Sequence, residues 1–386
     1  MKRTAPSAPA GRPGSAALVG SVGRCCDILS AFRHPEETLE LREIARRSRL
    51  NKSTVCRILA TLVVKGFVQR SGSHGYRAHL LRPPLRAFRL GYAAESASDP
   101  FITTVTDSLA TAAQAAGLEL IVLNNCASRR KAIQNADRLI RARVDLAVEF
   151  QMFSDIAENL AGKFSAAGIP LIAIGTPHPG AAYFGADNYK AGHIAGEHLG
   201  RWAARFWHGE VDEILLLIAS LGGPVLDARM LGVQDGIANS LPHTRNVPHA
   251  RLDTKTGTLG SAIELTRRHL GSGRARRILI GTMNDWTALG ALQAFRECAA
   301  ERECAIVGQG AVAEARHEMR RPGTRLIGAV GYFPETYGKK IVSLALNTLN
   351  HRAVPHASFT KHVIVTPANV NQMYPNDLLL GTLVRS

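Results

Sequence analysis

The sequence lacks an uninterrupted apolar run of the roughly 18 or more residues that a membrane-spanning helix requires. Its first twenty residues carry Lys2, Arg3 and Arg12 among Pro, Ala and Gly, and their one short apolar patch is too brief for the core of a secretory signal. We therefore expect a protein that has no membrane partner and stays in the cytoplasm.

Cysteines are few, and none has the spacing of a metal site. We expect buried thiols in a reducing compartment, namely Cys25, Cys26, Cys56, Cys126, Cys298 and Cys304. A nucleophile elbow, a phosphate-binding loop and a metal signature are also missing from the sequence. These absences predict that the protein has no cofactor and is not an enzyme.

Acidic residues are scarce in one part of the chain. Residues 1–86 hold 5 acidic and 16 basic residues, whereas the other 300 residues hold 26 acidic and 31 basic ones. Clustered positive charge on a small module is typical of a protein that binds a polyanion, because each contact with a phosphate releases counterions. A basic surface that is merely solvated is the alternative.

The basic segment has the periodicity of three helices, over about 19–32, 39–48 and 51–64. The first is expected to bury Val22, Cys25, Cys26, Leu29 and Phe32. Asn51 is a good N-cap for the third helix, whose buried face repeats at i, i+3, i+4 and i+7. Its opposite face carries Ser53, Thr54, Arg57 and Thr61. Residues 67–70 and 76–78 read as two strands around a turn, which would form a wing.

Residues 41–80 resemble the DNA-binding domain of IclR-type regulators. The resemblance rests on Asn51-Lys-Ser-Thr-Val55, Arg57, Leu59-Ala-Thr-Leu62 and Gly66-Phe67-Val68. It implies a winged helix-turn-helix whose Lys52, Ser53, Thr54 and Arg57 face double-stranded operator DNA. The helix pattern and the wing add three further candidate DNA-binding residues, Thr61, Arg70 and His74. A winged helix used only for contacts with proteins is the alternative.

Beyond residue 89 strands and helices alternate regularly, which is typical of parallel sheets covered by helices on both faces. Strands are expected over 90–94, 118–123, 145–150, 170–175, 213–220, 277–281, 305–308, 326–330 and 361–366. Ligands bind beyond the carboxyl ends of such strands. The loops there supply carboxylate, amide, guanidinium and aromatic groups, the parts of a pocket for a sugar or polyol.

This part of the chain resembles the type I periplasmic binding fold of ribose-type binding proteins and LacI-type repressors. The resemblance rests on Ser98-Asp-Pro-Phe101, Gly185-Ala-Asp-Asn-Tyr-Lys-Ala-Gly192, Arg229-Met-Leu-Gly-Val233 and Asn284-Asp-Trp-Thr-Ala-Leu-Gly-Ala291. It implies a small-molecule effector in contact with Asp99, Phe101, Arg229, Asn284, Gln309 and Tyr332. Thr176, in the loop Gly175-Thr-Pro-His178, is a further candidate. We place Arg229 in a glycine-rich loop, and assign Asp187 and Asn188 to a crossover between lobes.

Three positions depart from the sugar-binding pattern. Sugar binders usually have Asp or Asp-Arg after the fourth strand, whereas this chain has Ile174-Gly-Thr-Pro177. Gln309 stands where an acidic residue is common, and Asp99 replaces a frequent Asn. Another polar metabolite therefore remains open beside a hexose or pentose.

Together these patterns predict an α/β protein with an N-terminal winged helix-turn-helix and a two-lobed domain of the periplasmic-binding-protein type. The expected divisions are a basic tail (1–17), the DNA-binding domain (18–80), a linker (81–88) and the effector domain (89–386), with crossovers near 187, 332 and 354. Pro83 and Pro84 disfavour a hinge helix in the linker. We expect a homodimeric, effector-controlled transcription regulator. The alternatives are a solute receptor without DNA regulation and an enzyme acting on sugars.

Overall fold

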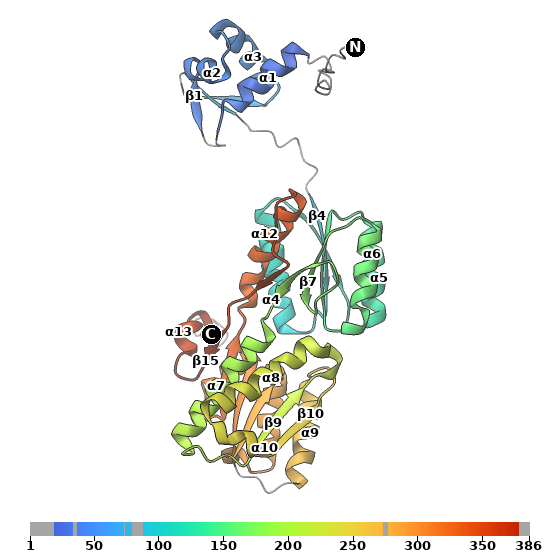
Figure 1. Cartoon of the computed structure of the whole chain (residues 1–386), viewed down its shortest axis with the longest axis vertical. Helices are drawn as coiled ribbons and strands as arrows, with labels where there is room; N and C mark the ends of the chain where they lie inside the picture. The colour runs from blue at the N-terminus through green and yellow to red at the C-terminus, as the bar shows by residue number, and fades with distance from the viewer. Residues whose placement is uncertain (1–18, 34–36, 73, 79–87, 273–276, 378–386) are drawn as a thin grey trace, which may run out of the picture. The chain divides into compact units, whose positions relative to one another are not determined.

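The computed structural model describes residues 19–33, 37–72, 74–78, 88–272 and 277–377. The chain forms two compact units, Met1–Arg86 and Ala87–Ser386, and we describe each by itself (Figure 1). The tail expected at 1–17 and the prolines of the expected linker lie outside the described residues. Within the described ranges no helix is both long enough and apolar enough to cross a bilayer.

The first unit packs three helices on a small antiparallel sheet. The helices are α1 (Gly20–Ser30), α2 (Leu41–Ser48) and α3 (Lys52–Val64), and the strands are β1 (Thr38–Glu40), β2 (Val68–Ser71) and β3 (Gly75–Ala78). The strand order is β1-β3-β2. The core consists mainly of aliphatic side chains from all of these elements, including Ile28, Phe32, Leu39, Ile44, Val55, Leu59 and Leu62.

Two expectations for this unit were wrong. Residues 38–40 form β1 rather than the start of the second helix, because Leu39 pairs with Tyr76 of β3 in an extended backbone. In α1 the buried residue is Ile28, while Val22 is 58% exposed; of the five residues expected to be buried, Phe32 just after α1 is buried, and Cys25 and Leu29 are half-buried. The apolar residues of α1 lie on two adjacent faces, and the core takes the face that carries the large Ile28 side chain.

The expectation of buried cysteines was also wrong. Only Cys304 is buried, Cys25 is half-buried, and the exposed thiols are Cys26, Cys56, Cys126 and Cys298. Cys56 shows the reason, because it follows the buried Val55 in α3 and so points about 100° away from the core.

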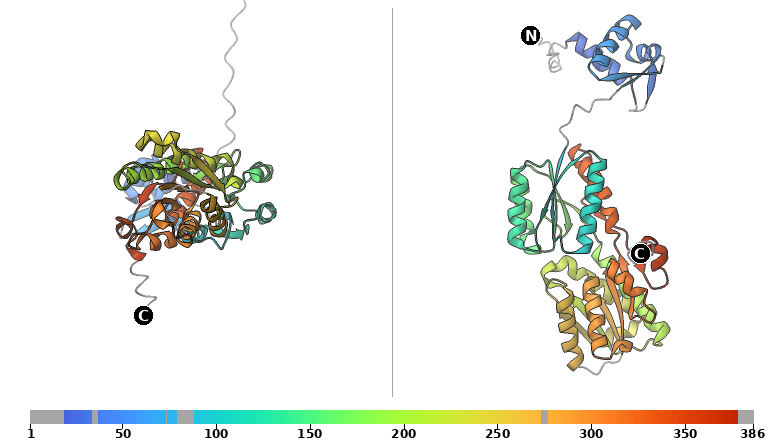
Figure 2. Two further views of the ribbon diagram at one scale, coloured as in Figure 1. Left: turned by 90° about the horizontal axis from the view of Figure 1, so that it is seen from below. Right: turned by 180° about the vertical axis from the view of Figure 1, so that it is seen from behind.

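The second unit has two lobes, each built on a six-stranded sheet. The N-lobe sheet has the order β14-β8-β7-β6-β4-β5, and all of its pairings are parallel. Its strands are β4 (Arg89–Ala94), β5 (Glu119–Asn124), β6 (Leu146–Gln151), β7 (Leu171–Gly175), β8 (Ala182–Gly185) and β14 (Ala357–Phe359). On one face lie α4 (Pro100–Ala115) and α12 (Tyr337–Leu349), and on the other α5 (Arg129–Arg141) and α6 (Ala157–Ala166) (Figure 2).

The C-lobe sheet has the order β10-β9-β11-β12-β13-β15, in which only β15 is antiparallel to its neighbour among the described strands. Its strands are β9 (Glu213–Ile218), β10 (His249–Asp253), β11 (Ile278–Thr282), β12 (Cys304–Gly310), β13 (Leu326–Gly331) and β15 (Val363–Val365). Helices α7 (Asn188–Phe206) and α8 (Gly223–Ser240) cover one face. The other face carries α9 (Leu259–Ser272), α10 (Asp285–Glu297) and α11 (Ala313–Met319), and α13 (Val370–Met373) follows β15.

The chain passes between the lobes at 186–187, at 332–333 and at 360–362. The third passage lies later than the expected position near 354, because β14 first pairs with β8 at the N-lobe edge. A hydrogen bond joins the first and third of these connections: the Asp187 N–H donates to His362 Nε2 over 3.0 Å. Burial lowers the pKa of His362 to about 4, so that this imidazole stays neutral and accepts the bond.

Candidate functional sites

The start of helix α3 is fixed by its own side chains. Asn51 is the N-cap, and its Oδ1 accepts hydrogen bonds from the Thr54 N–H (2.8 Å) and the Ser53 hydroxyl (3.0 Å). Arg49 ends α2 in the left-handed conformation (φ 56°), which turns the chain sharply into α3. Helix α3 is thus held by both its cap and the preceding turn.

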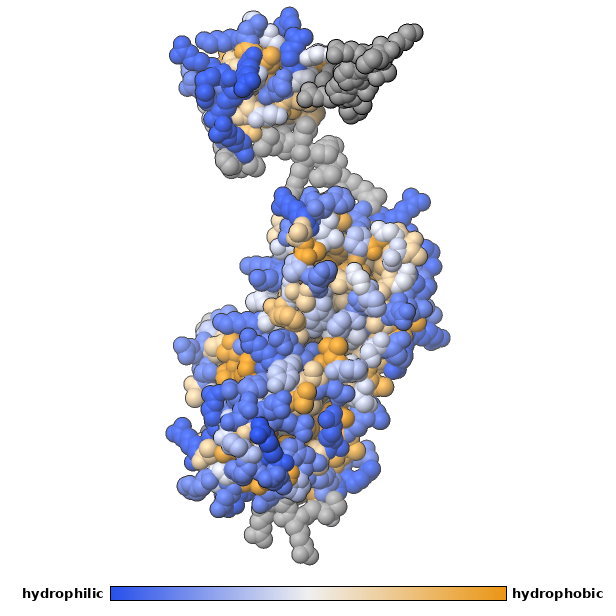
Figure 3. Space-filling model, viewed as in Figure 1, coloured by the Kyte–Doolittle hydropathy of each residue, from blue (hydrophilic) through white to orange (hydrophobic). Residues whose placement is uncertain are grey.

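Helix α3 has one buried and one exposed face. Val55, Leu59 and Leu62 are buried, and the candidate DNA-binding residues Lys52, Ser53, Arg57 and Thr61 are exposed, with Thr54 half-buried. The side chains of Lys52 and Arg57 make no hydrogen bond or ion pair with the parts of the chain that the structure describes. Arg70 and His74 are also exposed, on the hairpin of β2 and β3. Hydrophilic residues predominate on the visible face of this unit (Figure 3).

Two arginines of α2, Arg46 and Arg47, have internal partners instead. Arg47 donates to Glu43 (2.7 Å), Glu37 (2.9 Å) and the Ala31 carbonyl (3.0 Å), while Arg46 donates to Glu43. Hydrogen bonds from both arginines lower the pKa of Glu43 to about 2. These ion pairs brace α2, whereas Lys52 and Arg57 of α3 keep their donors available.

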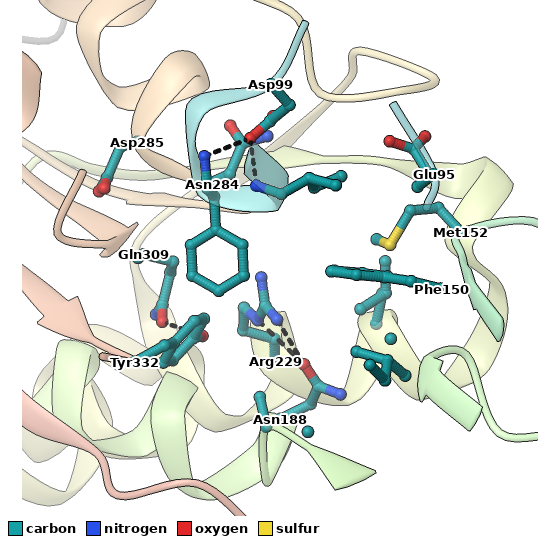
Figure 4. A pocket seen from close by; sticks show the side chains of 18 of the residues that line it. Glu95, Asp99, Phe150, Met152, Asn188, Arg229, Asn284, Asp285, Gln309 and Tyr332 are labelled. Atoms are coloured by element: carbon teal, nitrogen blue, oxygen red, sulfur yellow. Dashed lines mark hydrogen bonds between the residues drawn. The ribbon is translucent and has the colours of Figure 1, made fainter. Parts of the chain in front are cut away.

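A cavity lies between the two lobes of the second unit. Its volume is about 180 Å³. The N-lobe contributes acidic and apolar side chains, among them Glu95, Asp99, Phe101, Phe150 and Met152. The C-lobe contributes mostly polar ones, among them Asn188, Arg229, Asn284, Asp285, Trp286 and Gln309, and Tyr332 lies at a crossover (Figure 4).

Six of the seven candidate effector residues line this cavity: Asp99, Phe101, Arg229, Asn284, Gln309 and Tyr332. Thr176 is buried but is not among the lining residues. Gly175, in the left-handed conformation (φ 80°), lines the cavity in its place. The chain turns at this glycine, and the next side chain is therefore directed elsewhere.

Arg229 lies inside helix α8, so its assignment to a loop was wrong. The nearby glycines misled the interpretation, because Gly232 and Gly236 are helical residues that let α8 approach α7 closely. The guanidinium is 8% exposed and donates from Nε (3.1 Å) and Nη2 (2.6 Å) to Asn188 Oδ1, and from Nη1 to the Met283 carbonyl. Its carbon lies 5.4 Å from the centre of the Tyr332 ring.

Asn188 was missed as a lining residue. It is the first residue of α7, directly after the crossover, and one clue was that side chains at such a position project from the helix N-terminus beside the cleft. Glu95, at the carboxyl end of β4, was also missed. Burial and the nearby Asp99 raise the pKa of Glu95 to about 7, and burial raises that of Asp285 to the same value.

Two candidate residues also cap helices. Asp99 Oδ1 accepts the Phe101 N–H (2.8 Å) and the Ile102 N–H (3.3 Å) at the start of α4. Asn284 forms a capping box with Thr287 at the start of α10, and its Nδ2 donates to the Gly257 carbonyl (2.9 Å). These bonds orient both loops toward the cavity. Within the described ranges no cluster of three or more His, Cys, Asp or Glu could hold a metal ion.

Two family models match separate parts of the chain. The model described as "IclR helix-turn-helix domain" matches residues 21–72, and that described as "Periplasmic binding protein domain" matches residues 90–353. The chain belongs to the periplasmic binding protein domain family, with an IclR helix-turn-helix domain at its N-terminal end. Both resemblances proposed from the sequence are confirmed. Among curated proteins none matches this chain.

Solved structures confirm the fold of the second unit. A solute-binding protein from Actinobacillus succinogenes with bound D-allose is 16% identical, with a TM-score of 0.64 over 74% of this chain and 99% of that one. One from Bacillus halodurans with bound myo-inositol is 19% identical, with a TM-score of 0.64 over 75% and 97%. One from Agrobacterium vitis with bound allitol is 16% identical, with a TM-score of 0.66 over 76% and 99%.

Proposed function

We propose that this protein is a sequence-specific DNA-binding transcription regulator controlled by a small polar effector of the sugar or polyol class. The observation that carries the proposal is the combination, in one chain, of an exposed helix α3 face and a cavity between two lobes. The ligands of the three solved structures support the effector class, since each is a polyhydroxylated molecule.

On the DNA side, we assign base and phosphate contacts to the exposed face of α3. Arg57 has unpaired donors suited to a base edge or a phosphate, and Lys52 and Ser53 lie at the start of the same helix, where DNA readers place such residues. Thr54 and Thr61 extend this face, and Arg70 and His74 of the hairpin are the candidate wing contacts.

We propose that the two lobes close when an effector binds in the cavity between them. Leu221, in the C-lobe 3-10 helix Ser220–Gly222, packs against an N-lobe cluster that includes Phe153 and Ile156. An effector that contacts Arg229 and Gln309 on one lobe and Asp99 on the other binds the closed form more tightly. Such a differential affinity is what allows a ligand to shift a conformational equilibrium.

In the proposed mechanism, a homodimer couples effector binding in the cavity to DNA binding by helix α3. A single module of this size offers DNA only a small interface, whereas two tethered modules can bind half-sites about one helical turn apart. Lobe closure then changes the dimer geometry. A coupling free energy of about 1 to 3 kcal/mol would change DNA affinity about 5- to 150-fold.

The test uses the full chain and a DNA fragment selected from a random pool by binding to it. We expect fluorescence anisotropy to show tight, salt-dependent binding that one class of polyhydroxylated ligand changes at least fivefold, and sedimentation to show two chains per DNA duplex. A protein that binds such ligands but no DNA would be a solute receptor. Turnover of a bound sugar would indicate an enzyme. Either result would contradict the proposal.

A further inference from the structure

The C-lobe wall of the cavity carries a buried positive charge, Arg229, that has no carboxylate partner in the described part of the chain. All the protein acceptors of Arg229 are uncharged: the Asn188 amide oxygen, the Met283 carbonyl and, at 3.5 Å, the Met283 sulfur. No described carboxylate forms an ion pair with this guanidinium. A buried charge without a counterion is costly. One N–H of Nη2 is also left without a protein acceptor, since the guanidinium has five.

The side chains around Arg229 present further donors. Gln309 is 3% exposed, its Oε1 accepts the Tyr332 hydroxyl (2.6 Å), and its Nε2 is buried without a partner. Because Asn188 Oδ1 already accepts two hydrogen bonds from Arg229, the amide group that remains to it is its Nδ2 donor. We call the wall formed by Arg229, Asn188 and Gln309 the donor wall. It can donate hydrogen bonds to the oxygen atoms of a ligand, and it favours a ligand with a negative charge.

Three carboxylates line the cavity, namely Glu95, Asp99 and Asp285. Glu95 lies beside Met152 and Phe150, on the other side of Arg229 from Gln309 (Figure 4). Asp99 belongs to the N-lobe and uses Oδ1 to cap α4. Asp285 is 1% exposed, and its Oδ2 accepts the Val312 N–H (2.7 Å). Asp285 lines the C-lobe side of the cavity next to the Gly308–Gly310 segment, and its Oδ1 has no hydrogen-bond partner among the described residues. The N-lobe carboxylates Glu95 and Asp99 lie apart from the donor wall, where they can accept hydrogen bonds from hydroxyl groups.

We propose that the effector is a polyhydroxylated carboxylic acid, a sugar acid rather than a neutral sugar or polyol. Its carboxylate lies against the donor wall and supplies the missing counterion of Arg229: one oxygen accepts the remaining Nη2 N–H, and the other accepts the Gln309 Nε2 N–H. Its hydroxyl groups face Glu95 and Asp99, and the Trp286 and Phe150 side chains cover its apolar surface. This inference rests on the proposed function in taking the cavity as the effector site.

The experiment compares acids with neutral partners of the same carbon skeleton by calorimetry on the full chain. The pairs are gluconate and glucitol, galactonate and galactitol, ribonate and ribitol, glucuronate and glucose, and galacturonate and galactose. We expect at least one acid to bind at least tenfold more tightly than its neutral partner. A neutral compound that binds as tightly as its acid would overturn the inference, and so would failure of every acid to bind.

A charge change at the donor wall sharpens the test. Gln309→Glu places a carboxylate where Nε2 now lies. It should therefore raise the Kd of the preferred acid at least tenfold and raise the Kd of its neutral partner by a smaller factor. Gln114→Glu is the matched control, since Gln114 is exposed on α4 and makes no side-chain hydrogen bond with a described residue. If Gln309→Glu lowered the binding affinity of the acid and of its neutral partner by the same factor, the inference would be overturned. A neutral ligand that still alters DNA binding would overturn it too, but would leave the proposed function standing.

Discussion

Arg57 of α3 and Arg229 of α8 are both helical arginines without a carboxylate partner among the described residues, yet their surroundings are opposite. Arg57 is exposed, and its side chain has no partner in the ranges that the structure describes. Arg229 is buried and bonded to Asn188 and Met283. An exposed arginine costs the fold almost nothing, whereas a buried one must be held by its neighbours. The first unit thus presents a positive charge to solvent, whereas the second unit holds one inside its cavity.

The largest expected effect concerns the packing that holds Arg229. A Cβ added at Gly192 of α7 would lie 1.8 Å from the Arg229 carbonyl oxygen, so the two helices must separate. Gly192→Ala should lower the free energy of unfolding by about 3 kcal/mol, at the upper end of overpacking effects. Gly162→Ala is the matched control: nothing lies within 4 Å of its added Cβ, and alanine in a helix stabilises by up to about 1 kcal/mol. Similar denaturant midpoints for the two variants would show that α7 and α8 are not closely packed.

Arg229→Met should weaken effector binding by about 1.5 to 3 kcal/mol, the value of a hydrogen bond to a charged group, which is at least tenfold in Kd. The free energy of unfolding should change much less, because the cost of burying the charge offsets the hydrogen bonds that are lost. Calorimetry and thermal melting measure the two quantities. An unchanged Kd would place the effector elsewhere.

Arg57→Ala should weaken operator binding by about 1 to 3 kcal/mol and leave thermal stability and effector affinity unchanged. Its matched control is Arg302→Ala, which removes an exposed charge from the other unit. Anisotropy titrations with the operator and with unrelated DNA distinguish the two kinds of contact, since a base contact mainly affects the operator. If both variants bind the operator equally well, α3 is not the recognition helix.

A separate, pH-dependent effect concerns Glu149, a second buried ionisable group, whose Oε1 accepts the Asn125 side-chain N–H (2.8 Å). Burial raises its pKa from 4.5 to about 8. In the folded protein the carboxyl therefore keeps its proton, whereas above pH 4.5 the unfolded chain releases it. Stability should accordingly fall as pH rises from about 4.5 to 8, by at most about 1.4 kcal/mol per pH unit.

The comparison between Glu149→Gln and the parent chain isolates this group, because Glu95 and Asp285 titrate in the same range and in the same direction. Urea denaturation at several pH values should give a shallower decline for the variant. Parallel curves would mean that Glu149 is ionised in the folded protein.

The sequence predicts the exposed arginine better than the buried one, for physical reasons. The face of α3 follows from helical period alone, and Arg57 lies opposite Val55 and Leu59 in any context. The alternation of strands and helices likewise predicted parallel sheets covered by helices, and the resemblance to the periplasmic binding fold implied two lobes. The strands β1, β8, β10 and β14 escaped notice because none of them has a long apolar run; β1, β10 and β14 lie at sheet edges, and β8 lies next to the edge strand β14.

The residues that line the cavity were harder to predict from the sequence. Six of the seven candidates line it, yet the role of Asn188 depends on the approach of α7 to α8, which no local pattern shows. Thr176 was misplaced because one glycine, Gly175, redirects the chain. The absence of an ion pair at Arg229 is likewise visible only once the fold has brought distant segments together.

The central claim is that effector and DNA bind one coupled protein, and thermodynamic reciprocity tests it most directly. The measurement is the Kd of the effector for the full chain, by calorimetry, with and without saturating operator DNA. The account predicts that the operator changes this Kd by the same factor, between about 5 and 150, by which the effector changes operator affinity. An effector that binds with the same Kd in both cases would contradict it.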